Sequence, residues 1–382
     1  MHSLRWSGTA VLLREGCRPS RSFLRISSAS FENTFELRRL ISAHTKPSTG
    51  SSVTRRHLLI SRRRFIAAVS ASILSARSRA DLSQEQPAAT DLVAGIQLEW
   101  LGPALKASFD GTLRTISEMG YRNVELLSDF GRTPRQLVSS VRAHGLQCES
   151  RLFWASRDYA DSRSLLAQQI EFAEAMGLRY LVVLMPSPVP LADGLGGAAL
   201  ADALARLTLE DYKRQAEFLN TLGAQTQKAG IQLAYHNFNA EFRLYDGKPA
   251  YDYLLDWTDG SLVKMELDCG WVASSGMDPV RYLRDYPERF PLLHLKDVRV
   301  RDPNTVLRLD PIEVGFGIVN WDPLLAQAVA SGVKKAYVEF EPKKPYRRPL
   351  LQSANRCLDF LRLRARALHA LNRTPTSTIR AR

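Results

Sequence analysis

The sequence predicts an α/β fold, a (β/α)8 barrel of the TIM type, and three observations support this prediction. Short runs rich in β-branched and aromatic residues alternate with amphipathic stretches from Leu92 onward, as expected for repeated βα units with parallel strands. Eight such runs fit into about 280 residues, a usual size for this barrel. Ionisable residues end several of the runs, and strand ends are where such a barrel builds its site.

The eight expected strands can be placed directly on the sequence. They are Val93–Leu98, Asn123–Leu127, Gln147–Phe153, Tyr180–Met185, Ile231–His236, Val263–Asp268, Leu292–Lys296 and Ala336–Phe340. Helical stretches between them, such as 110–120, 133–145, 164–177 and 209–230, each end in Gly, as helix C-termini often do. A doubly wound open sheet is the alternative fold. It would place a G-x-G-x-x-G turn after the first strand, and GIQLEWLGPA at 95–104 has none.

Composition limits the classes of function. The 382 residues are 45% hydrophobic, enough for one large core or two smaller ones, and no apolar run reaches the ~18 residues of a membrane span. The net charge of +13 lies at the ends, because residues 1–90 hold 15 basic against 5 acidic residues and residues 372–382 add 3 basic ones. The body between is close to neutral, so we expect no nucleic-acid partner.

The first 80 residues are expected to be an N-terminal extension with a targeting signal. SRRRFI at 61–66 resembles a twin-arginine export motif, followed by a short apolar stretch and a plausible cleavage point after Ala80. This predicts a periplasmic or exported protein without membrane contact once the signal is removed. A mitochondrial transit peptide and a basic disordered arm are the alternatives, and residues 1–52 could be an over-extended gene start. The remaining division is a barrel at 81–371 and a basic tail at 372–382.

Polar residues at the strand ends are the candidates for chemistry. They are Glu125, Arg151, His236, Asn237, Glu266, Asp268, His294, Lys296, Glu339 and Glu341. Side chains alternate along a strand, so the pairs Glu266/Asp268, His294/Lys296 and Glu339/Glu341 each share a face.

Two imidazoles and two carboxylates from four strands form a mixed nitrogen and oxygen ligand set. His236, Asp268, His294 and Glu339 would suit Mn²⁺, Zn²⁺, Co²⁺ or Fe²⁺ better than Ca²⁺ or Mg²⁺. Taken singly, a strand-end His is more often a satisfied polar residue and a strand-end Asp is often a helix N-cap. Their occurrence on successive strands favours a divalent metal site.

Four ordered motifs carry a family resemblance. YHNFNAEF, ELDCGWV, LLHLKDV and YVEFEP resemble, in that order, the sugar phosphate isomerase/epimerase family with its xylose isomerase-like barrel, over about Leu92–Leu368. The resemblance implies a divalent metal, Mn²⁺ first, held by His236, Asp268, His294 and Glu339, and proton abstraction next to a carbonyl of a sugar or sugar derivative. It predicts a metal-dependent isomerase or epimerase.

The sequence departs from the family's ketose epimerases at two positions. Those enzymes have Glu where this chain has His236, and His where it has Trp271. One of the two proton-exchanging glutamates is therefore missing. Glu241 could reach back as a fourth ligand or as a base, and His236 could itself act as a base.

The remaining candidate residues complete the expected site. Glu339, Glu241 or His236 would move the proton, and Lys296 would stabilise developing oxyanion charge or instead pair with Asp297 or Glu266. Substrate contacts are predicted for Glu125, Trp154, Asn237 and Trp271, with the two tryptophans offering flat faces to a sugar ring. The Gly- and Pro-rich stretch Pro186–Ala203 is a candidate lid.

Three other functions remain open. Proton abstraction beside a ketone could expel an aglycone, which would make the protein a cleaving enzyme for 3-keto-glycosides. A non-catalytic sugar-binding barrel would keep the aromatic residues without needing the metal. An endonuclease IV-like nuclease would need more metal ligands and a basic surface. A small carbohydrate is the expected partner, with a homo-oligomer compatible with the sequence.

Overall fold

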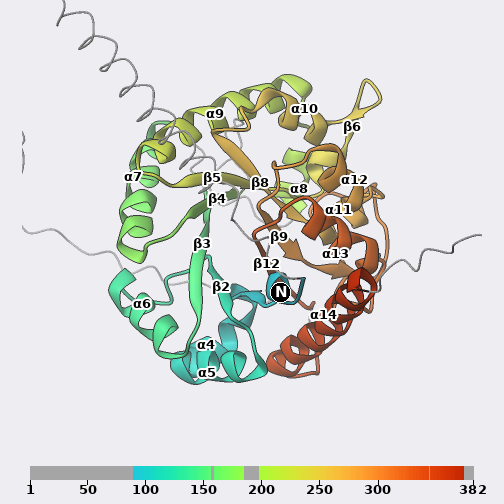
Figure 1. Cartoon of the computed structure of the whole chain (residues 1–382). Coiled ribbons are helices and arrows are strands. Elements are labelled where there is room, and N and C mark those ends of the chain that lie inside the picture. Colours follow the sequence, from blue (N-terminus) through green and yellow to red (C-terminus); the bar gives the residue numbers. More distant parts are fainter. Residues whose placement is uncertain (1–88, 156–158, 185–197, 344, 374–382) are drawn as a thin grey trace, which may run out of the picture. The chain divides into compact units, whose positions relative to one another are not determined.

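The computed structural model describes residues 89–155, 159–184, 198–343 and 345–373 of the chain (Figure 1). The signal motif, the basic tail and most of the stretch proposed as a lid lie outside these residues. Those three features therefore stay predictions.

The described residues form a closed barrel of parallel strands in the order β1-β12-β9-β8-β5-β4-β3-β2. The strands are β1 (Gly95–Gln97), β2 (Asn123–Leu126), β3 (Gln147–Trp154), β4 (Tyr180–Leu184), β5 (Gln232–His236), β8 (Val263–Asp268), β9 (Leu292–Leu295) and β12 (Lys335–Val338). Each observed boundary lies within two residues of the predicted one. The predicted barrel is therefore confirmed, and the open-sheet alternative is wrong.

Helices surround the ring of strands, as Figure 1 shows. They are α3 (Ala89–Leu92), α4 (Gly102–Ala107), α5 (Phe109–Met119), α6 (Pro134–Ala143), α7 (Tyr159–Met176), α8 (Ala198–Leu204), α9 (Leu209–Lys228), α10 (Ala250–Trp257), α11 (Cys269–Ser274), α12 (Pro279–Asp285), α13 (Trp321–Ala330) and α14 (Leu350–Arg373). The starts of α6 and α9 are fixed by capping boxes at Thr133 and Thr208. Gly120, with φ of 105°, ends α5 in the left-handed conformation that favours glycine.

The helix α8 corrects part of one prediction. Residues 198–203 were expected to belong to a long loop, but they lie within this helix. The run AALADAL there is rich in Ala and Leu, the strongest helix formers, and the Gly and Pro residues that suggested a loop all precede it.

Two hydrophobic clusters build the core. The smaller one fills the barrel interior with side chains from alternate strand positions, including Leu152, Val182 and Leu292. The larger one packs the outer faces of the strands against the helices. Because these side chains fill the interior, the barrel is a packed core and not a pore.

Short 3-10 turns and two-stranded antiparallel pairs lie in the connections between the barrel strands and the helices. Two 3-10 turns, η1 (Glu99–Leu101) and η2 (Ala240–Phe242), follow β1 and β5. Two antiparallel pairs, β6 (Leu244–Tyr245) with β7 (Lys248–Pro249) and β10 (Asp297–Val298) with β11 (Pro311–Ile312), lie outside the barrel.

The buried carboxylate of Asp297 organises the connection from β9 to α13. It accepts hydrogen bonds from the backbone N–H groups of Val298, Gly315, Gly317 and Val319, at 2.9–3.2 Å, and from the Trp321 indole at 2.9 Å. A Cβ at 317 would lie 2.2 Å from Asp297 Oδ1, so glycine is required there. Gly317 thus leaves room for this carboxylate, and both Gly315 and Gly317 donate to it.

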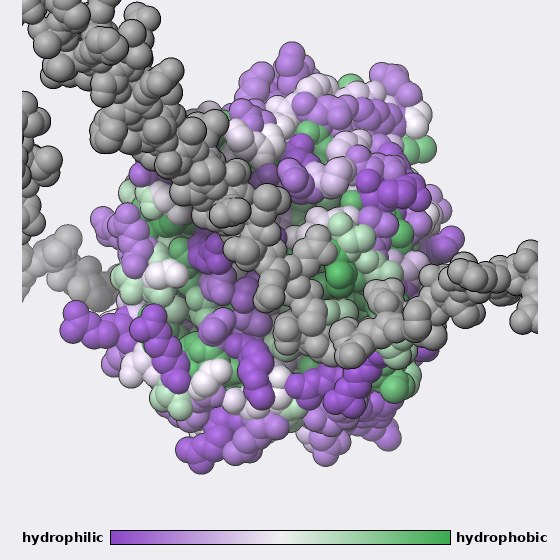
Figure 2. Space-filling view, viewed as in Figure 1, coloured by the Kyte–Doolittle hydropathy of each residue, from purple (hydrophilic) through white to green (hydrophobic). Residues whose placement is uncertain are grey.

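The surface is mostly polar. The face seen in Figure 2 carries mainly hydrophilic side chains with smaller hydrophobic patches between them. In the described part of the chain, every helix is too short or too polar to cross a membrane.

We predict that Asp297→Ala lowers the free energy of unfolding by at least about 3 kcal/mol, because it leaves several buried N–H donors without an acceptor. Urea denaturation of the full chain measures this difference. Asp310→Ala, at a side chain that is 48% exposed, is the matched control and should change stability little. A loss below about 1 kcal/mol at Asp297 would contradict the role given to its carboxylate.

Candidate metal centre

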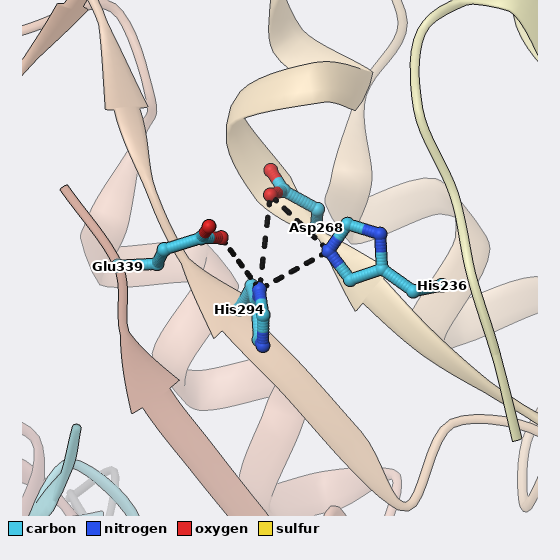
Figure 3. Close-up of side chains that lie close together, drawn as sticks. All are labelled: His236, Asp268, His294 and Glu339. Carbon is cyan, nitrogen blue, oxygen red and sulfur yellow. Dashed lines mark hydrogen bonds and ion pairs between the residues drawn. The ribbon is translucent and has the colours of Figure 1, made fainter. Parts of the chain in front are cut away.

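Four predicted ligands from four neighbouring strands meet at the mouth of the barrel. His236 ends β5, Asp268 ends β8, His294 lies in β9 and Glu339 follows β12. Their side chains point toward one another (Figure 3) and are all buried. One ligand atom from each of the four lies within 4.8 Å of the others.

The separations fit a single metal ion. His236 Nε2 lies 3.1 Å from His294 Nδ1 and 3.6 Å from Asp268 Oδ2, while His294 Nδ1 lies 2.6 Å from Glu339 Oε2 and 4.0 Å from Asp268 Oδ2. Two ligands bound tetrahedrally at about 2.1 Å from one ion would be about 3.4 Å apart. The set of two nitrogens and two carboxylate oxygens suits Mn²⁺, Zn²⁺, Co²⁺ or Fe²⁺.

The two carboxylate oxygens of Asp268 have different partners. Oδ1 accepts from the backbone N–H of Trp271 at 2.9 Å and caps α11, whereas Oδ2 faces the imidazoles. The helix-cap and metal-ligand interpretations of this residue are therefore compatible.

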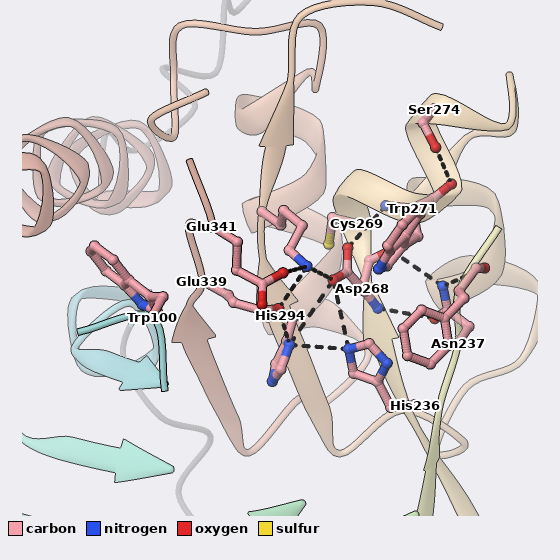
Figure 4. A network of polar contacts seen from close by, with 12 residues as sticks. Trp100, His236, Asn237, Asp268, Cys269, Trp271, Ser274, His294, Glu339 and Glu341 are labelled. Carbon is pink, nitrogen blue, oxygen red and sulfur yellow. Dashed lines mark hydrogen bonds and ion pairs between the residues drawn. The ribbon is translucent and has the colours of Figure 1, made fainter. Parts of the chain in front are cut away.

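Asn237 holds the backbone of Asp268, and Figure 4 shows it beside this strand end. Its Oδ1 accepts from the Asp268 N–H at 3.0 Å, and its Nδ2 lies 3.5 Å from the Asp268 carbonyl. The amide is fully buried. In the structure it positions a ligand, and its predicted substrate contact has no support from its surroundings.

Lys296 has partners that the sequence did not indicate. Its Nζ lies 3.1 Å from Asp268 Oδ2, 2.9 Å from Glu339 Oε2 and 3.6 Å from Glu341 Oε2. The predicted pairing with Asp297 or Glu266 is wrong, because Asp297 turns to the β9–α13 connection. A Cβ at Gly270 would lie 2.7 Å from Lys296 Cγ, so that glycine makes room for the lysine stem.

The charges at the site fix the protonation of Lys296. Burial alone would lower the pKa of Lys296, but the carboxylates of Asp268, Glu339 and Glu341 raise it above its usual range. Conversely, burial alone would raise the pKa of Glu339, but Lys296 and His294 hold it well below its usual value. An ammonium and an ionised carboxylate therefore lie side by side at the barrel mouth.

Glu241 does not reach the site, which corrects its prediction as a ligand or base. It accepts hydrogen bonds from the Tyr235 hydroxyl and from the Phe238 N–H at 3.1 Å. Tyr235 alternates with His236 along β5, so its side chain lies on the outer face of the barrel, near Gln215 of α9. Burial raises the pKa of Glu241 to about 7.

Two other strand-end residues lie away from the open mouth. Arg151 faces α7, where its Nε donates to Gln169 at 3.1 Å and its guanidinium lies over the Phe172 ring. Glu125 does face inward, but it is fully buried and contacts His294 Nε2 at 2.6 Å and Ser150 Oγ at 2.5 Å. This placement is below the ligands and gives no support to a substrate contact.

Aromatic rings form one wall beside the ligands. Trp154, 50% exposed, stacks on Phe238 with ring centroids 6.3 Å apart, and Phe238 lies 5.6 Å from Trp271 and 5.2 Å from His236. Trp271 is buried, with Lys296 Nζ 5.4 Å from its ring centroid. The two predicted tryptophans are thus brought together through Phe238, which the sequence analysis did not single out.

Asn239 is a second residue that sequence reasoning missed. Its side chain donates to the Thr305 carbonyl at 2.6 Å and accepts from the Leu307 N–H at 2.8 Å. It thereby joins the connection after β5 to the connection after β9. The only signal in the sequence was an Asn within HNFNAEF, which could not indicate a partner 66 residues away.

We predict that the full chain binds about one divalent ion, and that Asp268→Ala and His294→Ala each abolish this binding because they remove a ligand. Elemental analysis after reconstitution with Mn²⁺, Zn²⁺ or Co²⁺ measures the content. A chelator should also lower the melting temperature of the parent but not of these variants.

The control for this experiment is His144→Ala, at an imidazole that pairs with Asp110 away from the site. Its metal content should match that of the parent. Equal metal in the parent and in both ligand variants would rule out this centre.

Comparisons with known proteins agree with the fold. Curated relatives include the inosose dehydratase of Clostridium perfringens, 28% identical over 199 residues, and that of Geobacillus kaustophilus, 27% identical over 247 residues. These alignments cover 50% and 58% of this chain and 66% and 75% of the relatives, so the chain spans just under two thirds of the first.

Solved structures share the architecture at low identity. A sugar phosphate isomerase/epimerase from Parabacteroides distasonis superposes with a TM-score of 0.56 at 22% identity, covering 70% of this chain and 96% of that one. An L-ribulose 3-epimerase gives a TM-score of 0.53 at 12% identity, covering 74% and 98%. The family model described as xylose isomerase-like TIM barrel matches residues 113–363. The chain therefore belongs to the xylose isomerase-like TIM barrel family.

Proposed function

We propose that this protein is a divalent-metal-dependent lyase that acts on a sugar-derived ketone. It would remove a proton from the carbon beside the carbonyl and expel the oxygen substituent on the next carbon. The observation that carries this proposal is that only one of the two glutamates which exchange the proton in the ketose epimerases has a counterpart at this site. Glu339 lies among the ligands, whereas His236 replaces the strand-five glutamate of the ketose epimerases and Glu241 is turned outward.

The number of bases distinguishes elimination from epimerisation. Epimerisation at a carbon needs a proton taken from one face and returned to the other, which calls for groups on both sides of the substrate. Elimination needs one base and a leaving group. Among the described residues, the β5 side offers His236 Nε2, which points into the ligand cluster. This favours elimination over the isomerase or epimerase that the resemblance first implied.

Each residue of the site would have a distinct task. His236, Asp268, His294 and Glu339 would hold the ion, which when bound would polarise the substrate carbonyl as a Lewis acid. The ionised Glu339 would accept the proton, and the Lys296 ammonium would face the oxygen on which negative charge develops.

The elimination step balances without a further reactant. The C–H bond breaks, its electron pair forms a C=C bond, and the C–O bond to the leaving group breaks. The expelled oxygen takes up a proton, so the products are an unsaturated ketone and water or an alcohol.

The relatives support this class of reaction. The proteins of Clostridium perfringens and Geobacillus kaustophilus are named inosose dehydratases, and a dehydratase releases water by elimination. The site of this chain supports the same elimination, and we propose a sugar-derived ketone as its substrate. A non-catalytic sugar-binding barrel would not require four converging metal ligands.

We predict that the Mn²⁺-loaded protein converts a keto sugar or an inosose into an unsaturated ketone, with ultraviolet absorbance and loss of the leaving group. Glu339→Gln should lower the rate by about 10²-fold or more, because the amide cannot accept the proton. Mass spectrometry in D₂O distinguishes the outcomes. Deuterium incorporation with no loss of mass from the leaving group would instead establish an epimerase.

A second candidate function differs only in the leaving group. The wall from Trp154 through Phe238 to Trp271 extends from solvent to the ligands, with successive ring centroids 6.3 and 5.6 Å apart. One ring of the substrate would lie at the metal and a second against the half-exposed Trp154. This favours a 3-keto-glycoside whose aglycone, and not water, is expelled.

We predict that Trp154→Ala raises KM for an aryl 3-keto-glucoside by about tenfold and leaves KM for the methyl 3-keto-glucoside nearly unchanged, because only the aryl group would stack on the indole. Steady-state kinetics on the two substrates measures this difference. Phe316→Ala, at an exposed ring that contacts Arg356, is the matched control. An equal effect on both substrates would exclude a stacked aglycone.

A further inference from the structure

A second buried polar layer lies directly below the metal ligands. Glu125 of β2 and Glu266 of β8 are both fully buried, and a carboxylate oxygen of each lies close to His294 Nε2. We infer that Glu125 is a positioning residue, which determines that His294 presents Nδ1 and not Nε2 to the metal ion. This inference rests on the metal centre and not on the reaction proposed for it.

The two ring nitrogens of His294 face different groups. Nε2 lies 2.6 Å from Glu125 Oε2, whereas Nδ1 lies 3.1 Å from His236 Nε2 and 2.6 Å from Glu339 Oε2. A neutral imidazole has one N–H and one lone pair. A carboxylate accepting from Nε2 keeps the proton on that atom, which leaves the Nδ1 lone pair for the ion.

Glu125 is itself held in place by an irregularity in the sheet. The register between β2 and β3 pairs Val124 with Cys148 but Glu125 with Ser150, so Glu149 is skipped. The shift places Ser150 Oγ 2.5 Å from Glu125 Oε1. Without it, Glu125 would lie opposite another glutamate, which would repel it. The bulge thus places the Ser150 hydroxyl, a hydrogen-bond donor, opposite Glu125 in place of the Glu149 carboxylate.

Glu266 offers a competing interpretation. Its Oε2 lies 3.3 Å from His294 Nε2, and Glu125, Glu266 and His294 could by spacing hold an ion of their own. Such an ion would need the Nε2 lone pair while the ligand cluster uses that of Nδ1, and a neutral imidazole cannot supply both. We therefore assign the layer to orientation of His294.

The test is the affinity of the full chain for Mn²⁺ and Zn²⁺, measured by titration calorimetry on Glu125→Leu and Glu125→Gln. We expect Glu125→Leu to weaken binding by about 10- to 100-fold, as loss of a carboxylate behind a ligating histidine does. Glu125→Gln should weaken it less, because the amide oxygen still accepts from Nε2 but carries no charge. Glu149→Gln is the control, since Glu149 pairs with Lys335 and does not contact His294.

The melting temperature of the metal-free protein separates positioning from a structural role. Glu125→Gln keeps an acceptor for Ser150 Oγ and for His294 Nε2, so the metal-free variant should melt close to the parent while its metal affinity falls. A lower melting temperature with unchanged affinity would overturn the inference.

Three further outcomes are informative. Unchanged affinity in Glu125→Leu, with a parent that binds metal, would overturn this inference alone. A parent that binds no metal would overturn it together with the metal centre. Two ions per parent chain, one of them lost in Glu266→Gln, would assign the layer to a second ion and overturn the positioning role.

Discussion

Buried charge at the centre of the barrel is the constraint on which the rest of the structure depends. Four acidic side chains, those of Glu125, Glu266, Asp268 and Glu339, are buried around His294. Lys296 is the ammonium that the described residues place among them. Desolvating so many like charges is unfavourable unless cations, protons and hydrogen bonds compensate for it. A bound divalent ion would supply part of that compensation.

The fold holds this arrangement through backbone contacts just outside the ligands. Asn237 fixes the Asp268 peptide, the first turn of α11 takes one oxygen of Asp268, and Gly270 leaves space for the Lys296 stem. Asp297 gathers the N–H groups of the β9–α13 connection and so keeps its own carboxylate out of the site. A closed ring of strands makes such precision possible, because no strand end can move without its two neighbours.

The same scaffold supports different reactions in this family because the reaction depends on a few strand-end side chains. In this chain, His236 takes the place of a glutamate that ketose epimerases use as a base, and Trp271 takes the place of a histidine. In the proposed mechanism, the first change leaves Glu339 as the proton acceptor. The second places an aromatic ring next to Phe238, which in turn stacks on Trp154. Both changes are the basis of the proposed elimination on a ring-bearing substrate.

The sequence by itself determined the barrel and the cluster of four strand-end side chains, because both depend on local periodicity. Strand residues alternate, helices end at glycine, and an ionisable residue that ends a parallel strand must lie at the mouth, as His236, Asp268, His294 and Glu339 do. Contacts across the chain were decided only by the tertiary structure. The outward turn of Glu241, the carboxylates around Lys296 and the place of Glu125 beneath His294 depend on which side chains from distant strands compete for the same donors. The spacing of residues along one strand does not predict these contacts, because they form between side chains of different strands only when the barrel closes.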